Sequence, residues 1–287
     1  MKPTPKCKKQ HYLPAVYLKQ FSADGAKAKR SSLIWRFDQQ RSVRVPVESQ
    51  CAGDYFYSRR DSQGAEETFH GMEGAYGSIA QKIWSWRDST QRDFFGLILM
   101  MLDLHCRNVC YANRTREENV HAYQVRIHCL RNEILMGENH GPVSDLELLK
   151  HMRAVWRVKL LGTTKGNELV TSDNPAHLFT LNDVGSLHFV VMPVTPFYCA
   201  VAFDSRFCRA TGSNLTSADE SALNLLQALN CWECLFTLSA LSNGQQEFAR
   251  EKWKGGEKSL GYVDEREWSM TLKRQTDRDC FSFLTPV

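Results

Sequence analysis

Two glutamates and a histidine share one face of a predicted helix, where they could do chemistry together. Glu66, His70 and Glu73 stand at i, i+4 and i+7, so a helix brings them within about 60° of one another around its axis. At this spacing they could hold a divalent cation, and oxygen ligands favour magnesium or manganese over zinc. They could also form an acid–base pair, or only a solvated helix face. Gly77 continues the face and leaves room for a neighbour to approach.

A second polar group, Asp173-Asn174-Pro175, follows a predicted strand over residues 168–172. Asp173 could ligate a metal or act as a base, and Asn174 could donate to a phosphate or an oxyanion. Short polar residues before a proline are also common in turns, where their side chains bond to nearby backbone amides. Both interpretations stay open, and Asp173 is the better functional candidate of the two.

Cationic and aromatic groups complete the set of candidates. Arg107 lies one turn after Asp103 on an apolar predicted helix, so it either pairs with that carboxylate or binds an anionic ligand. His11 begins a segment with helical apolar spacing, and it could be a general base, a metal ligand or a partner of a backbone carbonyl. Tyr12 beside it could contact a substrate.

The charge of the chain is unevenly distributed. Residues 1–60 carry 13 Lys and Arg against 4 Asp and Glu, a net +9, and because the whole chain carries +4 the remainder carries −5. This asymmetry indicates a nucleic acid or another anionic partner near the N-terminal portion, although a basic arm that is only solvated has the same composition. Residues 1–9 are the most basic stretch, and we expect a disordered lead-in there.

Composition favours a soluble globular protein. The chain has 287 residues, of which 43% are hydrophobic and 24% charged. No apolar signal-peptide segment follows the basic N-terminus, and the apolar run 94–102 is far shorter than the roughly 20 residues of a spanning helix. Ten cysteines, several in apolar surroundings, indicate free thiols in a reducing compartment. We therefore expect a cytoplasmic protein without membrane association.

Cys231-Trp232-Glu233-Cys234 is a CxxC motif without the context of a site. No second CxxC and no histidine pair completes a zinc site, and no βαβ pattern surrounds the motif as in redox proteins. We interpret it as structural.

The predicted elements run from strands through helices back to strands. Apolar alternation predicts strands over residues 33–37, 42–47, 156–161, 168–172, 187–192 and 197–203. Apolar periodicity and capping boxes predict helices over residues 13–21, 66–87, 90–112, 115–136, 144–155 and 218–231. The loop 162–167 between two strands predicts a hairpin. This order indicates an α+β fold, with residues 10–287 as a single domain whose mostly antiparallel sheet packs against a helical middle section.

The opening His11-Tyr12-Leu13-Pro14, with Tyr17-Leu18 and Phe21, resembles the HYVPxFYLxxF start of a bacterial family, domain-of-unknown-function family 4238. Further features match in the same order over residues 10 to 240: Trp35, Tyr55-Phe56-Tyr57, Glu66, Glu73, Arg107, Thr171-Ser172-Asp173-Asn174-Pro175 and Pro193-x-x-Pro196. One departure is Ala176, which stands where an aliphatic residue such as valine is usual. The resemblance implies a shared fold and shared polar positions, and no activity comes with it.

Three hypotheses follow from these residues. The first is a metal-assisted hydrolase or nuclease that acts on a phosphate-containing substrate, with a role in bacterial defence. Its residues would be Glu66, Glu73 and Asp173 on magnesium or manganese, His11, Glu73, Asp173 and Asn174 in catalysis, and Tyr12 and Arg107 on the substrate. The second is a non-catalytic module that binds nucleic acid or protein with its basic N-terminal face, where Tyr12, Tyr17 and Trp35 would stack on bases. In the third, the polar positions only determine the fold of an interaction protein.

Overall fold

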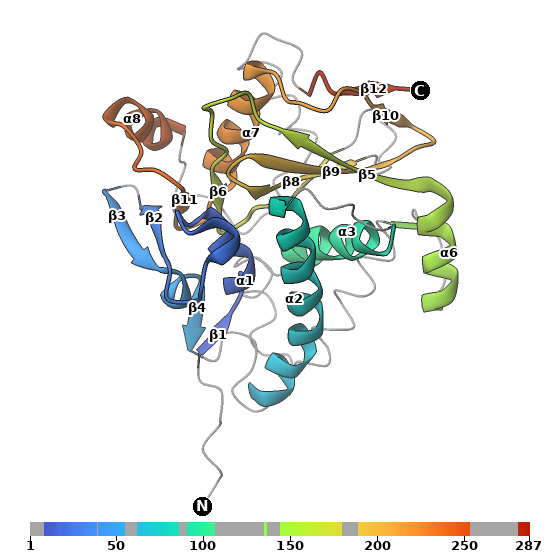
Figure 1. Ribbon diagram of the computed structural model, residues 1–287, viewed down its shortest axis with the longest axis horizontal. Coiled ribbons are helices and arrows are strands. Elements are labelled where there is room, and N and C mark those ends of the chain that lie inside the picture. Colours follow the sequence, from blue (N-terminus) through green and yellow to red (C-terminus); the bar gives the residue numbers. More distant parts are fainter. Residues whose placement is uncertain are drawn as a thin grey trace, which may run out of the picture.

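The computed structural model describes residues 9–38, 40–54, 62–85, 91–106, 135–136, 144–179, 189–252 and 281–287, and it confirms an α+β fold (Figure 1). The strands are β1 (Lys9–His11), β2 (Leu33–Phe37), β3 (Ser42–Pro46), β4 (Ala52–Asp54), β5 (Trp156–Gly162), β6 (Thr171–Ser172), β7 (His177–Phe179), β8 (Phe189–Thr195), β9 (Tyr198–Asp204), β10 (Cys208–Ala210), β11 (Leu235–Thr237) and β12 (Leu284–Pro286). The helices are α1 (Ala15–Leu18), α2 (Ser62–Ser85), α3 (Gln91–Cys106), α6 (Asp145–Val155), α7 (Ser217–Asn230) and α8 (Asn243–Lys252), with 3-10 helices η1 (Lys19–Phe21), η2 (Gly25–Lys27) and η3 (Val47–Ser49). No helix in this part of the chain is long and apolar enough to cross a membrane.

Two antiparallel four-stranded sheets carry the fold. Their strand orders are β3-β2-β11-β6 and β5-β9-β8-β7. The first sheet joins the N-terminal hairpin β2–β3 to two short strands from far along the chain, since Phe236 of β11 lies opposite Arg36 on one side and Thr171 on the other. Pro46 ends the edge strand β3, where a residue without a backbone N–H interrupts no pairing.

The second sheet is buried on both faces. Along its central strands β8 and β9, Val190 and Ala202 belong to the core that includes residues of α2 and α3, whereas Val191 and Val201 belong to the core that includes α7. This alternation is the period of two of a pleated strand. Figure 1 shows α7 on one side of these strands and α2 and α3 on the other. Helices on both faces explain why the two strands read as continuous apolar runs.

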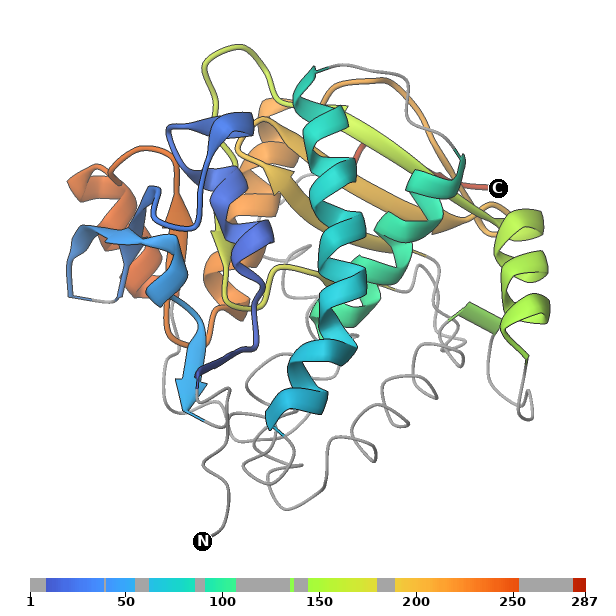
Figure 2. The same ribbon diagram turned by 60° about the horizontal axis from the view of Figure 1, so that its bottom comes forward.

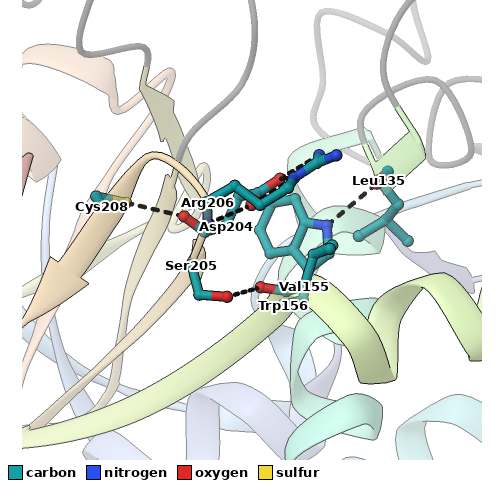
Figure 3. Close-up of polar contacts among 7 residues, drawn as sticks. All are labelled: Leu135, Val155, Trp156, Asp204, Ser205, Arg206 and Cys208. Atoms are coloured by element: carbon teal, nitrogen blue, oxygen red, sulfur yellow. Dashed lines mark hydrogen bonds and ion pairs between the residues drawn. The ribbon is translucent and has the colours of Figure 1, made fainter. Parts of the chain in front are cut away.

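Polar contacts hold the end of the second sheet to α6. Figure 3 shows Ser205, just after β9, whose hydroxyl donates to the carbonyl of Val155 at the end of α6 (2.7 Å). Asp204 is 2% exposed, and its carboxylate pairs with Arg206 at 2.6 Å. The indole Nε1 of Trp156 donates to a backbone carbonyl at 3.1 Å. The side chains of Asp204, Ser205 and Trp156 thus all have partners, so this corner is a structural joint.

The helical segment near the N-terminus docks between the two sheets. Tyr17 is fully buried, and its hydroxyl donates to the carbonyl of Pro193 in β8 (2.8 Å) while it contacts the hydroxyl of Thr171 in β6 (2.5 Å). Figure 2 shows α1 beside α2. The space at Gly77 admits this neighbour, because a Cβ at Gly77 would lie 2.9 Å from Cγ2 of Val16. The predicted helix 13–21 is therefore α1 followed by η1.

Two local predictions were wrong. Strands β5 and β6 do not form a hairpin: β5 pairs with β9, and β6 pairs with β11. The loop between them is bound instead by the buried carboxylate of Glu220, which accepts from Thr164 and from the side chain of Asn167. The sequence pattern Ser217-x-x-Glu220 predicts the capping box of α7, but the box lies one residue earlier. Thr216 and Asp219 exchange the two capping hydrogen bonds, and the Glu220 carboxylate binds the loop instead.

The docking of α1 can be tested with Tyr17→Phe. The variant leaves the Pro193 carbonyl and the Thr171 hydroxyl without their partner, so we expect the free energy of unfolding to fall by about 1–3 kcal/mol. Urea unfolding followed by circular dichroism measures the change. Tyr76→Phe is the matched control, because the Tyr76 hydroxyl makes a longer bond (3.5 Å, to Val194) and should cost less. If Tyr17→Phe lowered the free energy of unfolding no more than Tyr76→Phe, the role of Tyr17 in joining the two sheets would be contradicted.

Candidate functional site

Asp173 lies in the polar turn Ser172-Asp173-Asn174-Pro175 and is 2% exposed. Its Oδ1 accepts from the backbone N–H of Trp232 (2.7 Å) and its Oδ2 from that of Glu233 (2.6 Å). Its own N–H donates to the carbonyl of Cys234 at 3.3 Å. Both carboxylate oxygens are therefore used to hold the turn before β11, a segment far along the chain and not the nearby amides of a local turn.

Tyr12 and His11 approach this turn from the N-terminus. The Tyr12 hydroxyl donates to the carboxylate of Glu233 at 3.4 Å, and the side chain is 7% exposed. Burial raises the Tyr12 pKa well above its ordinary value, and the neighbouring Cys51 and Asp173 add to the shift. Nε2 of His11 lies 3.1 Å from the carbonyl of Glu48, so the imidazole contacts the backbone. The structure thus brings Tyr12 and Asp173 together.

Asn174 has a different environment from its neighbour. Its backbone N–H donates to the hydroxyl of Ser172 (3.2 Å). Its Oδ1 is buried and has no hydrogen-bond partner among the residues that the structure describes. Just after the motif, Nδ1 of His105 lies 3.0 Å from the carbonyl of Ala176, and burial lowers the pKa of His105. The turn is therefore held both by α3 and by the segment before β11.

The helix face with two glutamates is described only in part. Glu73 is partly buried on α2, His70 is exposed, and the side chain of Glu66 lies outside the described residues. Arg107 also lies outside them. Within the described ranges, no group of three or more His, Cys, Asp or Glu side chains could hold a metal ion. The assignment of Glu66, Glu73 and Asp173 to one metal site stays a prediction.

A shallow basic groove was missed as a specific site, although the excess of positive charge pointed to its region. The groove has a volume of about 550 Å³ and lies beside the hairpin β2–β3. Its lining consists of Asp24, Lys27, Lys29, Ser31, Ser32, Leu33 and Arg44. Asp24 is engaged within the wall, because Oγ of Ser32 donates to its carboxylate at 2.5 Å. The three cationic side chains are exposed and outnumber this carboxylate.

The CxxC motif shares its apolar surroundings with a cysteine from a distant segment. Cys234, the last residue of the motif, is buried in the same core cluster as Cys51. The pKa of Cys234 is raised well above its usual range, first by its hydrogen bond to Cys51 and then by burial. Cys231 instead donates to the carbonyl of Ala228 at 3.3 Å. No sequence pattern connects two cysteines so far apart.

Comparison with known proteins identifies the family of this chain. The structure defines an α+β protein in which an N-terminal segment and a polar turn lock two antiparallel sheets. The family model "Protein of unknown function (DUF4238)" matches residues 9–237, and the chain belongs to this family. No curated protein and no solved structure gives a significant match. The resemblance read from the HYLP opening is thereby confirmed.

The structural role of Asp173 can be tested with Asp173→Ala. The variant removes a charged acceptor from two backbone N–H groups, and bonds to charged groups contribute about 1.5–3 kcal/mol each. We expect a loss of about 3 kcal/mol in the free energy of unfolding, measured in urea. Asp38→Ala is the control. The Asp38 carboxylate is partly exposed, accepts one longer bond from the N–H of Arg41 (3.3 Å) and has a loose ion pair with Arg36 (3.9 Å), so its loss should cost far less. If Asp173→Ala had the same free energy of unfolding as the wild type, the structural role of Asp173 would be contradicted.

Proposed function

We propose that this protein binds single-stranded nucleic acid along the basic groove beside the hairpin β2–β3. The observation that carries the proposal is the gathering of Lys27, Lys29 and Arg44 around one concave surface. Phosphate groups are the ligands that such clustered cations attract most strongly. A volume of about 550 Å³ lies within the range of small-ligand sites and suits a short stretch of nucleotides rather than a duplex.

The hairpin adds an aromatic ring on the same face as the cations. Trp35 lies directly opposite Arg44 in the pairing of β2 with β3, so both side chains leave the same face of the sheet. Leu33 shares this face and lines the groove. Trp35 is only partly buried, which leaves ring surface for a base to stack on.

Two of the three aromatic residues expected to stack on bases are buried and hydrogen bonded within the protein. Tyr12 is 7% exposed and Tyr17 is fully buried. Their hydroxyls bond to Glu233 and to Pro193. The prediction that these two rings stack on a ligand was therefore wrong, because the core and the joint between the sheets hold them. Trp35 is the remaining candidate of the three.

Charge reversal in the groove tests the proposal. The triple variant Lys27→Glu, Lys29→Glu, Arg44→Glu should lose binding to a labelled mixed-sequence single-stranded oligonucleotide in fluorescence anisotropy. If each cation neutralises one phosphate, the slope of log affinity against log salt should become shallower by about 2. Trp35→Ala should weaken binding by about 1–3 kcal/mol with the slope unchanged.

Lys150→Glu with Arg153→Glu is the matched control for charge. Both residues are exposed on α6, which lies across the molecule from β2 and β3 (Figure 1). This variant should bind like the wild type. Equal affinities for the groove variant and the control, or wild-type binding that does not depend on salt, would overturn the proposal.

The metal-assisted hydrolase or nuclease stays a prediction with its own test. Nuclease and phosphatase assays with magnesium or manganese would compare the wild type with Glu73→Ala and Asp173→Ala. Glu73→Ala is the more informative variant, because Asp173 also holds the turn before β11. The hydrolase hypothesis expects metal-dependent turnover that Glu73→Ala reduces. No metal-dependent activity on any substrate would reject it.

A further inference from the structure

The basic groove contains one carboxylate that no cation neutralises. Asp24 is exposed and lines the groove together with Lys27, Lys29 and Arg44. Among the residues that the structure describes, none of these three cations forms an ion pair with Asp24. Like charges repel, so an unpaired carboxylate in a groove for phosphates opposes binding of the nucleic-acid backbone. Its presence there calls for a role other than charge balance.

The two oxygens of this carboxylate have different surroundings. Oδ2 accepts from the hydroxyl of Ser32 (2.5 Å), and that hydroxyl itself accepts from the N–H of Lys29 (2.8 Å). Oδ1 has no hydrogen-bond partner in the described part of the chain. Holding Ser32 needs an acceptor but not a negative charge, and an asparagine would supply one. One oxygen thus holds the wall of the groove, and the other is available to a ligand.

The backbone around Asp24 is held by short-range hydrogen bonds. The N–H of Asp24 donates to Oγ of Ser22 (3.3 Å), and its carbonyl accepts from the N–H of Lys27 (3.1 Å). The N–H of Gly25 donates to the carbonyl of Ser22 (3.0 Å), and Gly25 adopts a φ of +52°, which glycine tolerates. The carboxylate is therefore preorganised, so a ligand loses little affinity to the ordering of this wall.

We propose that Asp24 recognises a guanine base in the single strand that the groove binds, an inference that rests on the proposed function. The Watson–Crick edge of guanine carries two neighbouring donors, N1–H and the N2 amino group, and this edge is open in a single strand. Cytosine and adenine carry one amino donor beside an acceptor nitrogen, and thymine and uracil carry one N–H between two carbonyl acceptors. A carboxylate only accepts hydrogen bonds, so guanine matches it best. Leu33, which is 40% exposed in the same groove, offers an apolar surface to the base.

Fluorescence anisotropy with labelled oligonucleotides that differ in one base tests this proposal. A thymine strand with one central guanine should bind the wild type about 5-fold more tightly than the all-thymine strand, the lower end of what a bidentate pair discriminates. Hypoxanthine in place of guanine lacks the N2 amino group and should lose most of this gain. 7-Deazaguanine keeps the Watson–Crick edge and should retain the gain, which separates Asp24 from a contact of Arg44 with N7 and O6.

Two variants decide whether Asp24 is the source of the preference. Asp24→Asn should lose the gain from guanine, because the carboxylate is removed while an acceptor for Ser32 remains. Its affinity for the all-thymine strand should not fall, since a negative charge leaves the groove. Glu48→Gln is the matched control, because Glu48 is exposed and does not line the groove. This variant should keep the preference for guanine.

The outcomes separate this inference from the proposed function. If no strand bound the wild type, the proposed function would fail, and recognition of guanine would fail with it. If all strands bound with a steep salt dependence but guanine gave no gain, or if Asp24→Asn kept the gain, recognition by Asp24 would be overturned while binding along the groove would stand.

Discussion

The buried hydroxyl of Tyr17 joins the two four-stranded sheets, and the arrangement of the fold depends on this junction. Tyr17 donates to Pro193 in the second sheet and contacts Thr171 in the first. Because the hydroxyl has one proton, donation to the carbonyl leaves it as the acceptor for Thr171. All three groups are buried, so loss of the Tyr17 hydroxyl would leave both the Pro193 carbonyl and the Thr171 hydroxyl without this partner. The opening segment of the chain is therefore a structural wedge, and the groove lies beside the hairpin of the first of these sheets.

The elements that local sequence decides were predicted well. The strands β2 and β3 and the capping box of Ser144 with Glu147 follow from alternation and from capping chemistry that a few adjacent residues complete. The two strands predicted on either side of Pro193-x-x-Pro196 correspond to β8 and β9, which pair with each other. The hairpin expected from β5 to β6 failed for the opposite reason. Its turn residues were suitable, but pairing with β9 and β11 and the buried Glu220 decided the arrangement over long sequence separations.

The candidate site shows the same contrast between interactions of adjacent residues and interactions over long sequence separations. Asp173 was singled out as a candidate, and its two partners are backbone N–H groups of residues 232 and 233. Backbone donors cannot be recognised in a sequence, so the carboxylate looked equally suited to a metal. Cys234 shares a motif with Cys231, yet the thiol of Cys231 donates to the carbonyl of Ala228. Composition indicated the basic region, and only the fold could show which cations line one groove.

The hairpin β2–β3 presents different side chains on its two faces. Trp35 faces the groove side with Arg44, because the two residues lie opposite each other, and the alternation along the strand turns Arg36 to the other face. The chain beside the groove is also hydrogen bonded, since the N–H of Val47 donates to the carbonyl of Ser32 (3.0 Å). The backbone that carries Arg44 and Trp35 is therefore held in place by pairing, so a ligand would meet a surface that is already formed.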